Sequence, residues 1–210
     1  TPCGTLFPYT TLFRSSPRYG IPDAYSDVTR AVRFVRRNAA EFGVDPERLA
    51  AMGNSAGGHL ALLLGTRGEN GTVSGDPLEQ ISSRIAAVIA LVPPTDLTVA
   101  VWESPDSLPG YRWFPALDLS MELAAEYSPL EHVTPDDAPS LIIIGGADEL
   151  VPPFHGERMA SAFKQENVPH ELIVFTEAGH DLGDWERVHE ESIRWLNTHL
   201  AAYADSSTQR

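Results

Sequence analysis

A serine, an acid and a histidine can together perform nucleophilic catalysis. Candidates for these three roles lie far apart in the chain, at Ser55, Asp148 and His180. A serine hydroxyl is a weak nucleophile until a base takes its proton, and an imidazole becomes that base when a carboxylate orients it. The order along the chain is serine, acid, histidine, and each residue closely follows a predicted strand. We therefore predict Ser55 as the nucleophile, His180 as the base and Asp148 as the orienting acid.

The serine lies in the segment Gly53-Asn54-Ser55-Ala56-Gly57, between a short apolar run and an apolar helical pattern. A Gly-x-Ser-x-Gly pattern in that context indicates a nucleophile elbow, in which the serine occupies a strained turn between a strand and a helix. We expect Gly53 and Gly57 to let strand and helix pass close together, because neither has a Cβ atom. The pattern alone also fits an ordinary Gly/Ser-rich loop.

Other histidines and acids compete for the two partner positions. His180 is the histidine that follows a strand pattern and has a flexible glycine beside it. The others fall on predicted helices, in the segment between two strands, or at the amino end of a strand: His59, His132, His155, His170, His189 and His199. Among the acids, Asp148 follows a strand at its carboxyl end, where ligands bind in open α/β sheets. Asp96, which also follows a strand, is the second candidate.

Apolar patterns predict the elements that must position these residues. Apolar runs predict strands at residues 49–52, 85–91, 141–144 and 171–175. Helical spacing predicts helices at residues 23–42, 55–64, 152–166 and 185–203. We expect Gly43 to stop the first helix, Phe42 and Ile193 to lie on buried helix faces, and residues 204–210 to form a polar tail. Strands that alternate with helices predict an α/β fold, with a mainly parallel sheet and helices on both faces.

The stretch between the second and third predicted strands has no strand pattern of its own. We predict a small cap insert at residues 95–138, placed over the carboxyl ends of the strands, where it shapes a substrate pocket. Its aromatic residues are candidates either for that pocket or for the core of the cap itself: Trp102, Tyr111, Trp113 and Phe114.

Composition limits the partners and the class of protein. The 210 residues suit one good-sized domain, and the 42% of hydrophobic residues are enough for a core. The formal net charge of -14 argues against nucleic acid or an anionic membrane as the main partner. The single cysteine, Cys3, allows neither an intrachain disulfide nor a cysteine-based metal site, and no apolar run reaches the length of a membrane span.

From about residue 23 to residue 200 the chain resembles bacterial esterases of the α/β-hydrolase superfamily. It is most similar to the hormone-sensitive-lipase-like and the feruloyl- and acetyl-ester carbohydrate esterase (BD-FAE-like) groups. The matching segments are residues 53–59, 94–97, 127–129, 145–152 and 179–180. The resemblance implies the α/β-hydrolase fold, a Ser55, Asp148 and His180 triad, and hydrolysis of short-chain or carbohydrate-linked acyl esters through an acyl-enzyme. It implies a small-molecule ester as substrate, with no metal and no cofactor.

Two features depart from that family pattern. Asn54 stands where many of these enzymes carry an acid. No His-Gly-Gly motif precedes Ser55, although the oxyanion of a tetrahedral intermediate needs at least two donors, of which the Ala56 backbone N–H is one. Since the earlier strands of the family are also missing upstream, we expect a hydrolase domain that is incomplete at its N-terminus and spans residues 17–210.

The first residues have a different character. Residues 1–16 show neither helical nor strand periodicity, and residues 8–15 resemble translated sequencing-adapter read-through. We therefore expect residues 1–16 to be a leader that is not native to the protein.

Two other interpretations remain open. A serine peptidase resembling the prolyl-oligopeptidase catalytic domain shares the triad order and an Asp-x-x-Val-Pro loop, present here at residues 148–152. That group usually carries an aromatic residue after the nucleophile, whereas Ala56 follows Ser55 here. The third interpretation is an inactive fragment that lacks a complete oxyanion hole, and a probe for reactive serines distinguishes it from both enzymes.

Overall fold

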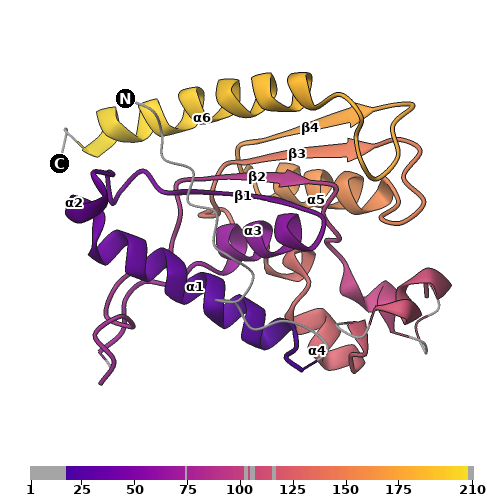
Figure 1. The fold of residues 1–210 in the computed structure, drawn as a ribbon, viewed down its shortest axis with the longest axis horizontal. Coiled ribbons are helices and arrows are strands. Elements are labelled where there is room, and N and C mark those ends of the chain that lie inside the picture. Colours follow the sequence, from indigo (N-terminus) through magenta and orange to yellow (C-terminus); the bar gives the residue numbers. More distant parts are fainter. Residues whose placement is uncertain (1–17, 74, 102–103, 105–106, 115–116, 208–210) are drawn as a thin grey trace.

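The computed structural model describes residues 18–73, 75–101, 104, 107–114 and 117–207. The expected leader, Trp102 and the side chain of Trp113 lie outside this description. Four strands form one sheet, in which neighbouring strands run parallel in the order β1-β2-β3-β4 (Figure 1). Their bounds are β1 Ala50–Asn54, β2 Ala87–Leu91, β3 Ser140–Gly145 and β4 His170–Phe175.

Helices cover both faces of this sheet (Figure 1). On one face, α6 (Trp185–Ser207) contacts β2 and β3. On the other, α3 (Ala56–Arg67) packs on β1 and β2, and α5 (Phe154–Gln165) packs on β3 and β4, while α1 (Ile21–Arg37) contacts α3. The predicted α/β class, with a parallel sheet between helical layers, is confirmed.

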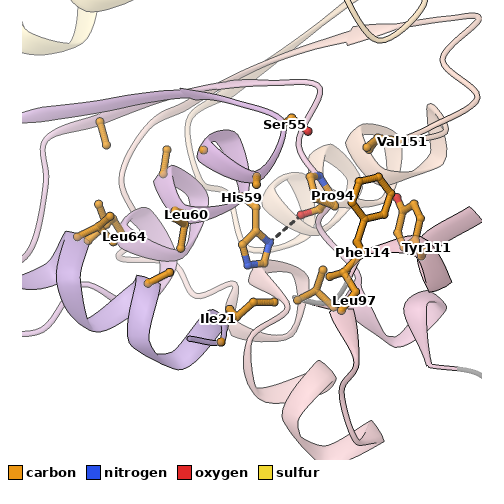
Figure 2. Close-up of a pocket in the computed structure, with 18 of the residues that line it drawn as sticks. Ile21, Ser55, His59, Leu60, Leu64, Pro94, Leu97, Tyr111, Phe114 and Val151 are labelled. Atoms are coloured by element: carbon orange, nitrogen blue, oxygen red, sulfur yellow. Dashed lines mark hydrogen bonds between the residues drawn. The ribbon is translucent and has the colours of Figure 1, made fainter. Parts of the chain in front are cut away.

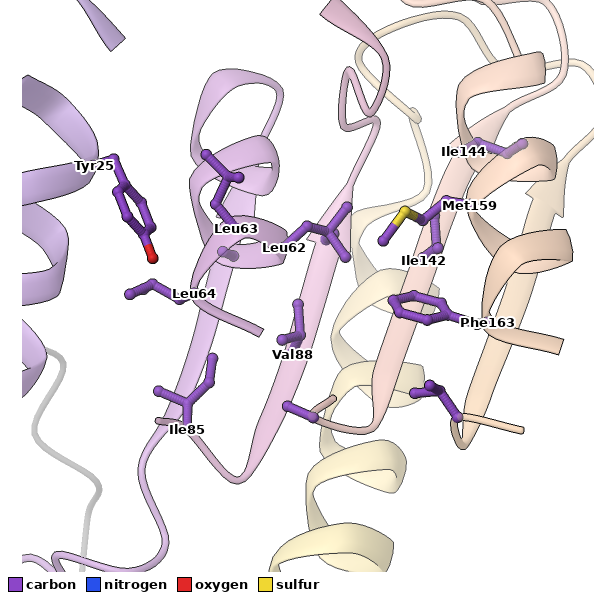
Figure 3. Packing of buried hydrophobic residues seen from close by; sticks show 14 residues of the cluster. Tyr25, Leu62, Leu63, Leu64, Ile85, Val88, Ile142, Ile144, Met159 and Phe163 are labelled. Atoms are coloured by element: carbon purple, nitrogen blue, oxygen red, sulfur yellow. The ribbon is translucent and has the colours of Figure 1, made fainter. Parts of the chain in front are cut away.

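The sequences of the two central strands, β2 and β3, account for their burial. Every residue of β2 and β3 is buried, which fits continuous apolar runs covered by helices on both faces. The largest core cluster lies between the sheet and the helices α1, α3 and α5 (Figure 3). Its labelled members are Tyr25, Leu62, Leu63, Leu64, Ile85, Val88, Ile142, Ile144, Met159 and Phe163. Burying one such side chain stabilises the fold by roughly 1.5–3 kcal/mol, so this cluster holds α3 and α5 against the sheet.

Strand β1 is the edge of the sheet among the described residues. It pairs with β2 on one side, and its residues alternate between exposed and half-buried. Met52 is 54% exposed, which is high for a methionine in a strand. The strand predicted at residues 49–52 is therefore present, but it starts one residue later and ends two residues later than predicted. Among the described residues, β2 is its one neighbouring strand.

The segment predicted as the first helix forms two helices in the structure. α1 is followed by the short helix α2 (Ala39–Phe42), which ends at Gly43 in a left-handed conformation with φ of 65°. The predicted stop at Gly43 is confirmed. Phe42 is 37% exposed and contacts the ring of Phe34 at a centroid distance of 6.0 Å, so its predicted burial is wrong.

The last helix packs the expected Val188 and Leu196 against the core, but not Ile193. Ile193 is 46% exposed, whereas Val188 and Trp195 are buried. Ser192 takes the buried position on this face, because its hydroxyl donates a hydrogen bond to the Val188 carbonyl at 2.7 Å and is thereby satisfied. α6 also continues to Ser207, beyond the predicted end at residue 203.

Between β2 and β3 the described residues contain no strand, as predicted. They form short helical pieces: η1 Leu97–Ala100, η2 Pro109–Trp113, α4 Met121–Glu126 and η4 Pro129–His132. This irregular segment occupies the position of the predicted cap.

Candidate functional site

Ser55 occupies the sharp turn between β1 and α3. Its backbone has φ of 55° and ψ of -119°, a positive φ that costs a residue with a Cβ roughly 1–3 kcal/mol. The turn is held from both sides, since the Ser55 N–H donates to the Leu91 carbonyl and the His59 N–H donates to the Ser55 carbonyl. The serine side chain is thus presented at the carboxyl end of β1, as a nucleophile elbow requires.

Glycines allow the close approach at this turn, but they are not both the predicted ones. A Cβ at Gly53 would lie 2.2 Å from the backbone carbon and oxygen of Gly57. A Cβ at Gly58 would lie 2.9 Å from the Leu91 oxygen, whereas one at Gly57 would meet nothing within 4 Å. The tight contacts are therefore at Gly53 and Gly58, and the prediction for Gly57 is wrong because its missing Cβ would point into open space.

This difference gives a matched pair of variants. Gly53→Ala is expected to destabilise the protein by at least about 2 kcal/mol, because the new Cβ meets backbone atoms that cannot rotate away. Gly57→Ala places the same methyl group in open space and is the control. Urea unfolding of both variants measures the difference, and an equal loss of stability in the two would contradict the packing described here.

The structure brings the three predicted side chains into one hydrogen-bonded chain. Ser55 Oγ lies 2.9 Å from His180 Nε2, and His180 Nδ1 lies 2.8 Å from Asp148 Oδ2. The three come from the ends of β1, β3 and β4, whose carboxyl ends share one edge of the parallel sheet. This topology brings His180 into contact with Ser55, 125 residues away in the chain, and with Asp148, 32 residues away.

The environment of Asp148 determines the direction of these hydrogen bonds. Its side chain is 1% exposed, and Oδ1 accepts hydrogen bonds from the N–H groups of Leu150 and Val151, both at 2.9 Å. Oδ2 then accepts from the Nδ1–H of His180, which leaves Nε2 unprotonated and able to accept the Ser55 proton.

The competing residues lie elsewhere. Asp96, the second candidate acid, accepts from the Thr98 N–H and forms an ion pair with Arg158 at 3.0 Å. It therefore belongs to the start of η1 rather than to His180. Glu149, which follows Asp148, is exposed.

Beside Ser55 lies an apolar cavity of about 620 Å³ (Figure 2). Its walls come from α1, from α3, from the segment after β2, and from the loop that follows Asp148. Figure 2 labels Ile21, Ser55, His59, Leu60, Leu64, Pro94, Leu97, Tyr111, Phe114 and Val151 along it. Tyr111 and Phe114 of the predicted cap thus contact this cavity.

His155 is a buried residue whose importance the sequence did not reveal. Its Nδ1 accepts a hydrogen bond from the Thr95 N–H at 3.1 Å, so its Nε2–H donates to Tyr111 Oη, also at 3.1 Å. Thr95 Oγ1 in turn donates to the His155 carbonyl. Burial lowers the pKa of His155 to about 4 and raises the pKa of Tyr111, so both are neutral near pH 7. These bonds join η2 and the segment after β2 to α5. A histidine in an amphipathic helix gives no sign of them in the sequence.

The described residues contain no group of three or more His, Cys, Asp or Glu side chains arranged to hold a metal ion. In the same part of the chain, no helix has both the length and the apolar character needed to cross a membrane.

Comparison with known proteins shows that the chain is similar to esterases. Residues 9–163 match the family model described as BD-FAE. Esterase LipU of Mycobacterium tuberculosis is 29% identical to the chain over 88% of its residues, and the chain spans 62% of the length of that relative.

Solved structures show the same relationship. The acetyl ester-xyloside bifunctional hydrolase from Caldicellulosiruptor lactoaceticus is 27% identical, with a TM-score of 0.74, over 93% of this chain and 70% of that one. The thermophilic esterase Est2 from Thermogutta terrifontis, solved with butyrate bound, is 28% identical, with a TM-score of 0.71, over 88% of this chain and 69% of that one. These similarities confirm the predicted α/β-hydrolase fold.

Proposed function

The chain belongs to the BD-FAE family, and from this premise we propose that it is a serine carboxylesterase acting on short-chain or carbohydrate-linked acyl esters. The hydrogen-bonded series Ser55, His180 and Asp148 at the elbow supports this proposal most strongly. A serine, an imidazole and a buried carboxylate in this order are the groups that acyl transfer needs.

In the proposed reaction, His180 Nε2 takes the Ser55 proton while Oγ attacks the ester carbonyl carbon. The carbonyl oxygen becomes an oxyanion next to the N-terminus of α3. The first helical bond of α3 starts from the His59 N–H, so the Ala56 N–H has no partner within the helix and is available as one oxyanion donor. The positive end of the α3 dipole adds to this stabilisation.

Collapse of the tetrahedral intermediate breaks the bond to the alcohol oxygen, which receives the proton from His180 Nε2. The acyl group remains on Ser55 Oγ. A water molecule then gives a proton to His180 Nε2 while its oxygen attacks the acyl carbon. The bond between that carbon and Ser55 Oγ breaks, Oγ takes the proton back from His180, and the acyl group leaves as a carboxylic acid. Asp148 holds the imidazole in the tautomer that each step requires and stabilises its charged form.

The cavity favours an apolar acyl group. Its apolar walls suit an alkyl or aromatic acyl group. The butyrate bound to the Thermogutta esterase and the acetyl esters named for the Caldicellulosiruptor enzyme support this substrate class.

A series of p-nitrophenyl esters tests the proposal. We expect turnover of acetate and butyrate, a fall in kcat/KM for long acyl chains, and labelling of Ser55 by a fluorophosphonate probe. A peptidyl-prolyl amide substrate in parallel distinguishes the peptidase interpretation. Absence of both turnover and labelling would contradict the proposed function, and a maximum at long acyl chains would contradict the proposed substrate class.

A further inference from the structure

The segment between β2 and β3 supplies one wall of the apolar cavity. Tyr111 of η2 and Phe114, the residue after η2, line the cavity together with Ser55 (Figure 2). In that view they lie far from Leu64, which lines the opposite end. Phe114 is 42% exposed, so this wall reaches the mouth of the cavity. The position of η2 therefore determines which acyl groups fit beside the nucleophile.

Hydrogen bonds connect η2 and the residue before it to two other elements. The Leu108 N–H, at the start of η2, donates to the Val99 carbonyl of η1 at 2.7 Å. The His155 Nε2–H of α5 donates to Tyr111 Oη at 3.1 Å, and the two rings are stacked with an interplanar angle of 9°. The first bond stays within the segment between β2 and β3, whereas the second reaches a helix that packs directly on the sheet. The second bond therefore fixes the wall relative to the sheet.

The His155 imidazole is itself held on several sides. The residue is fully buried, and its ring stacks on that of Phe154 at a centroid distance of 4.3 Å. Its Nδ1 accepts from the Thr95 N–H at 3.1 Å, and its backbone N–H donates to the Pro152 carbonyl, also at 3.1 Å. Because these contacts fix both the ring and its tautomer, the Nε2–H has one direction, toward Tyr111.

The same stretch of chain carries the acid that contacts His180. Asp148 Oδ1 accepts from the Val151 N–H at 2.9 Å, and Val151 also lines the cavity. α5 begins directly after this loop, and His155 is its second residue. The acid that binds His180 and the histidine that holds Tyr111 thus belong to one short, hydrogen-bonded stretch. Through this stretch, the cavity wall has a fixed position relative to the acid.

We propose that His155 is a positioning residue for acyl selectivity, because its Nε2–H holds Tyr111, and with it Phe114, at a fixed place in the cavity wall. This inference rests on the proposed esterase function and assigns the selectivity of that site to a residue outside the described lining of the cavity. A wall held in one place accepts the acyl groups that fit it and rejects others, whereas a wall that shifts loses this discrimination.

Tyr111→Phe removes the acceptor of this bond and keeps the aromatic ring. The measurement is kcat/KM for p-nitrophenyl butyrate and for p-nitrophenyl pivalate. Each value is divided by the rate of alkaline hydrolysis of the same ester, which removes the difference in intrinsic reactivity. We expect the wild type to prefer the straight chain over the branched one. In Tyr111→Phe, the ratio of the two values is expected to move toward one by roughly tenfold, because small displacements of a positioning group change rates by such factors.

Two variants at His155 separate its two ring nitrogens. His155→Gln places an amide N–H near the position of Nε2, so it can still donate to Tyr111 Oη. His155→Asn places an amide oxygen near Nδ1, so it keeps the bond from the Thr95 N–H but ends short of Tyr111. We expect the wild-type ratio to persist largely in His155→Gln and to be lost in His155→Asn to the same extent as in Tyr111→Phe.

Tyr25→Phe is the matched control. Tyr25 is also a buried tyrosine, and its Oη donates to the Arg67 carbonyl at 3.0 Å, but it is not among the described residues that line the cavity. This variant is expected to lower the Tm and to keep the wild-type ratio. A merely structural role of the bond from His155 would lower the Tm of Tyr111→Phe in the same way and leave its ratio unchanged.

The outcomes separate this inference from the proposed function. A ratio near one in the wild type, or an unchanged ratio in both Tyr111→Phe and His155→Asn, would overturn the role of His155 while turnover of the two esters leaves the esterase function intact. Absence of turnover of either ester by the wild type would instead contradict the proposed function.

Discussion

Ser55→Ala is expected to lower kcat for p-nitrophenyl acetate by about 10⁴- to 10⁶-fold. The hydroxyl of Ser55 lies 2.9 Å from the base that would take its proton, and a methyl group can neither give a proton nor form an acyl-enzyme. The residual rate reflects substrate binding and the Ala56 oxyanion donor, with water as the nucleophile. Single-turnover measurements with purified protein give the rate, and mass spectrometry reports the loss of fluorophosphonate labelling.

The control for this variant is Ser161→Ala. Ser161 lies on the exposed side of α5, away from the elbow, so its replacement keeps the wild-type rate. Ser55→Ala should also keep a cooperative thermal transition, because the Ser55 backbone bonds to Leu91 and His59 do not involve the side chain. A rate for Ser55→Ala within tenfold of the wild type would exclude Ser55 as the nucleophile.

Asp148→Asn is expected to lower kcat by about 10⁴-fold with little change in fold. The asparagine oxygen can still accept from the N–H groups of Leu150 and Val151 at the position of Oδ1. The amide nitrogen then replaces Oδ2, and as a donor it requires Nδ1 of His180 to accept. That tautomer carries its proton on Nε2, so this nitrogen can no longer accept the Ser55 proton.

Asp96→Asn is the matched comparison for this effect. Asp96 binds Thr98 and Arg158 instead of His180, so its variant is expected to lose less than tenfold in kcat. The two variants together decide which acid orients the histidine. A larger loss in Asp96→Asn than in Asp148→Asn would reverse the assignment.

The order of Ser55, Asp148 and His180, and their common location at strand ends, followed from the sequence alone. The apolar runs at β2 and β3 report burial on both faces directly, and parallel strands bring their carboxyl ends to one edge. The local turn at Ser55 was also predictable, because a Gly-x-Ser-x-Gly pattern between a strand and a helix reflects backbone constraints over a few residues. The sheet and its helical layers were therefore predicted with small errors at the ends of elements.

Tertiary structure decided the features that depend on which distant atoms meet. Gly58 rather than Gly57 is the close contact, because the carbonyl of Leu91 approaches from the neighbouring strand. A buried histidine looks the same in sequence whether both ring nitrogens have partners, as in His155, or Nε2 has none among the described residues, as in His59. Periodicity records that a helix face is buried, whereas hydrogen-bond pairing and cavity walls are set by contacts between segments far apart in the chain.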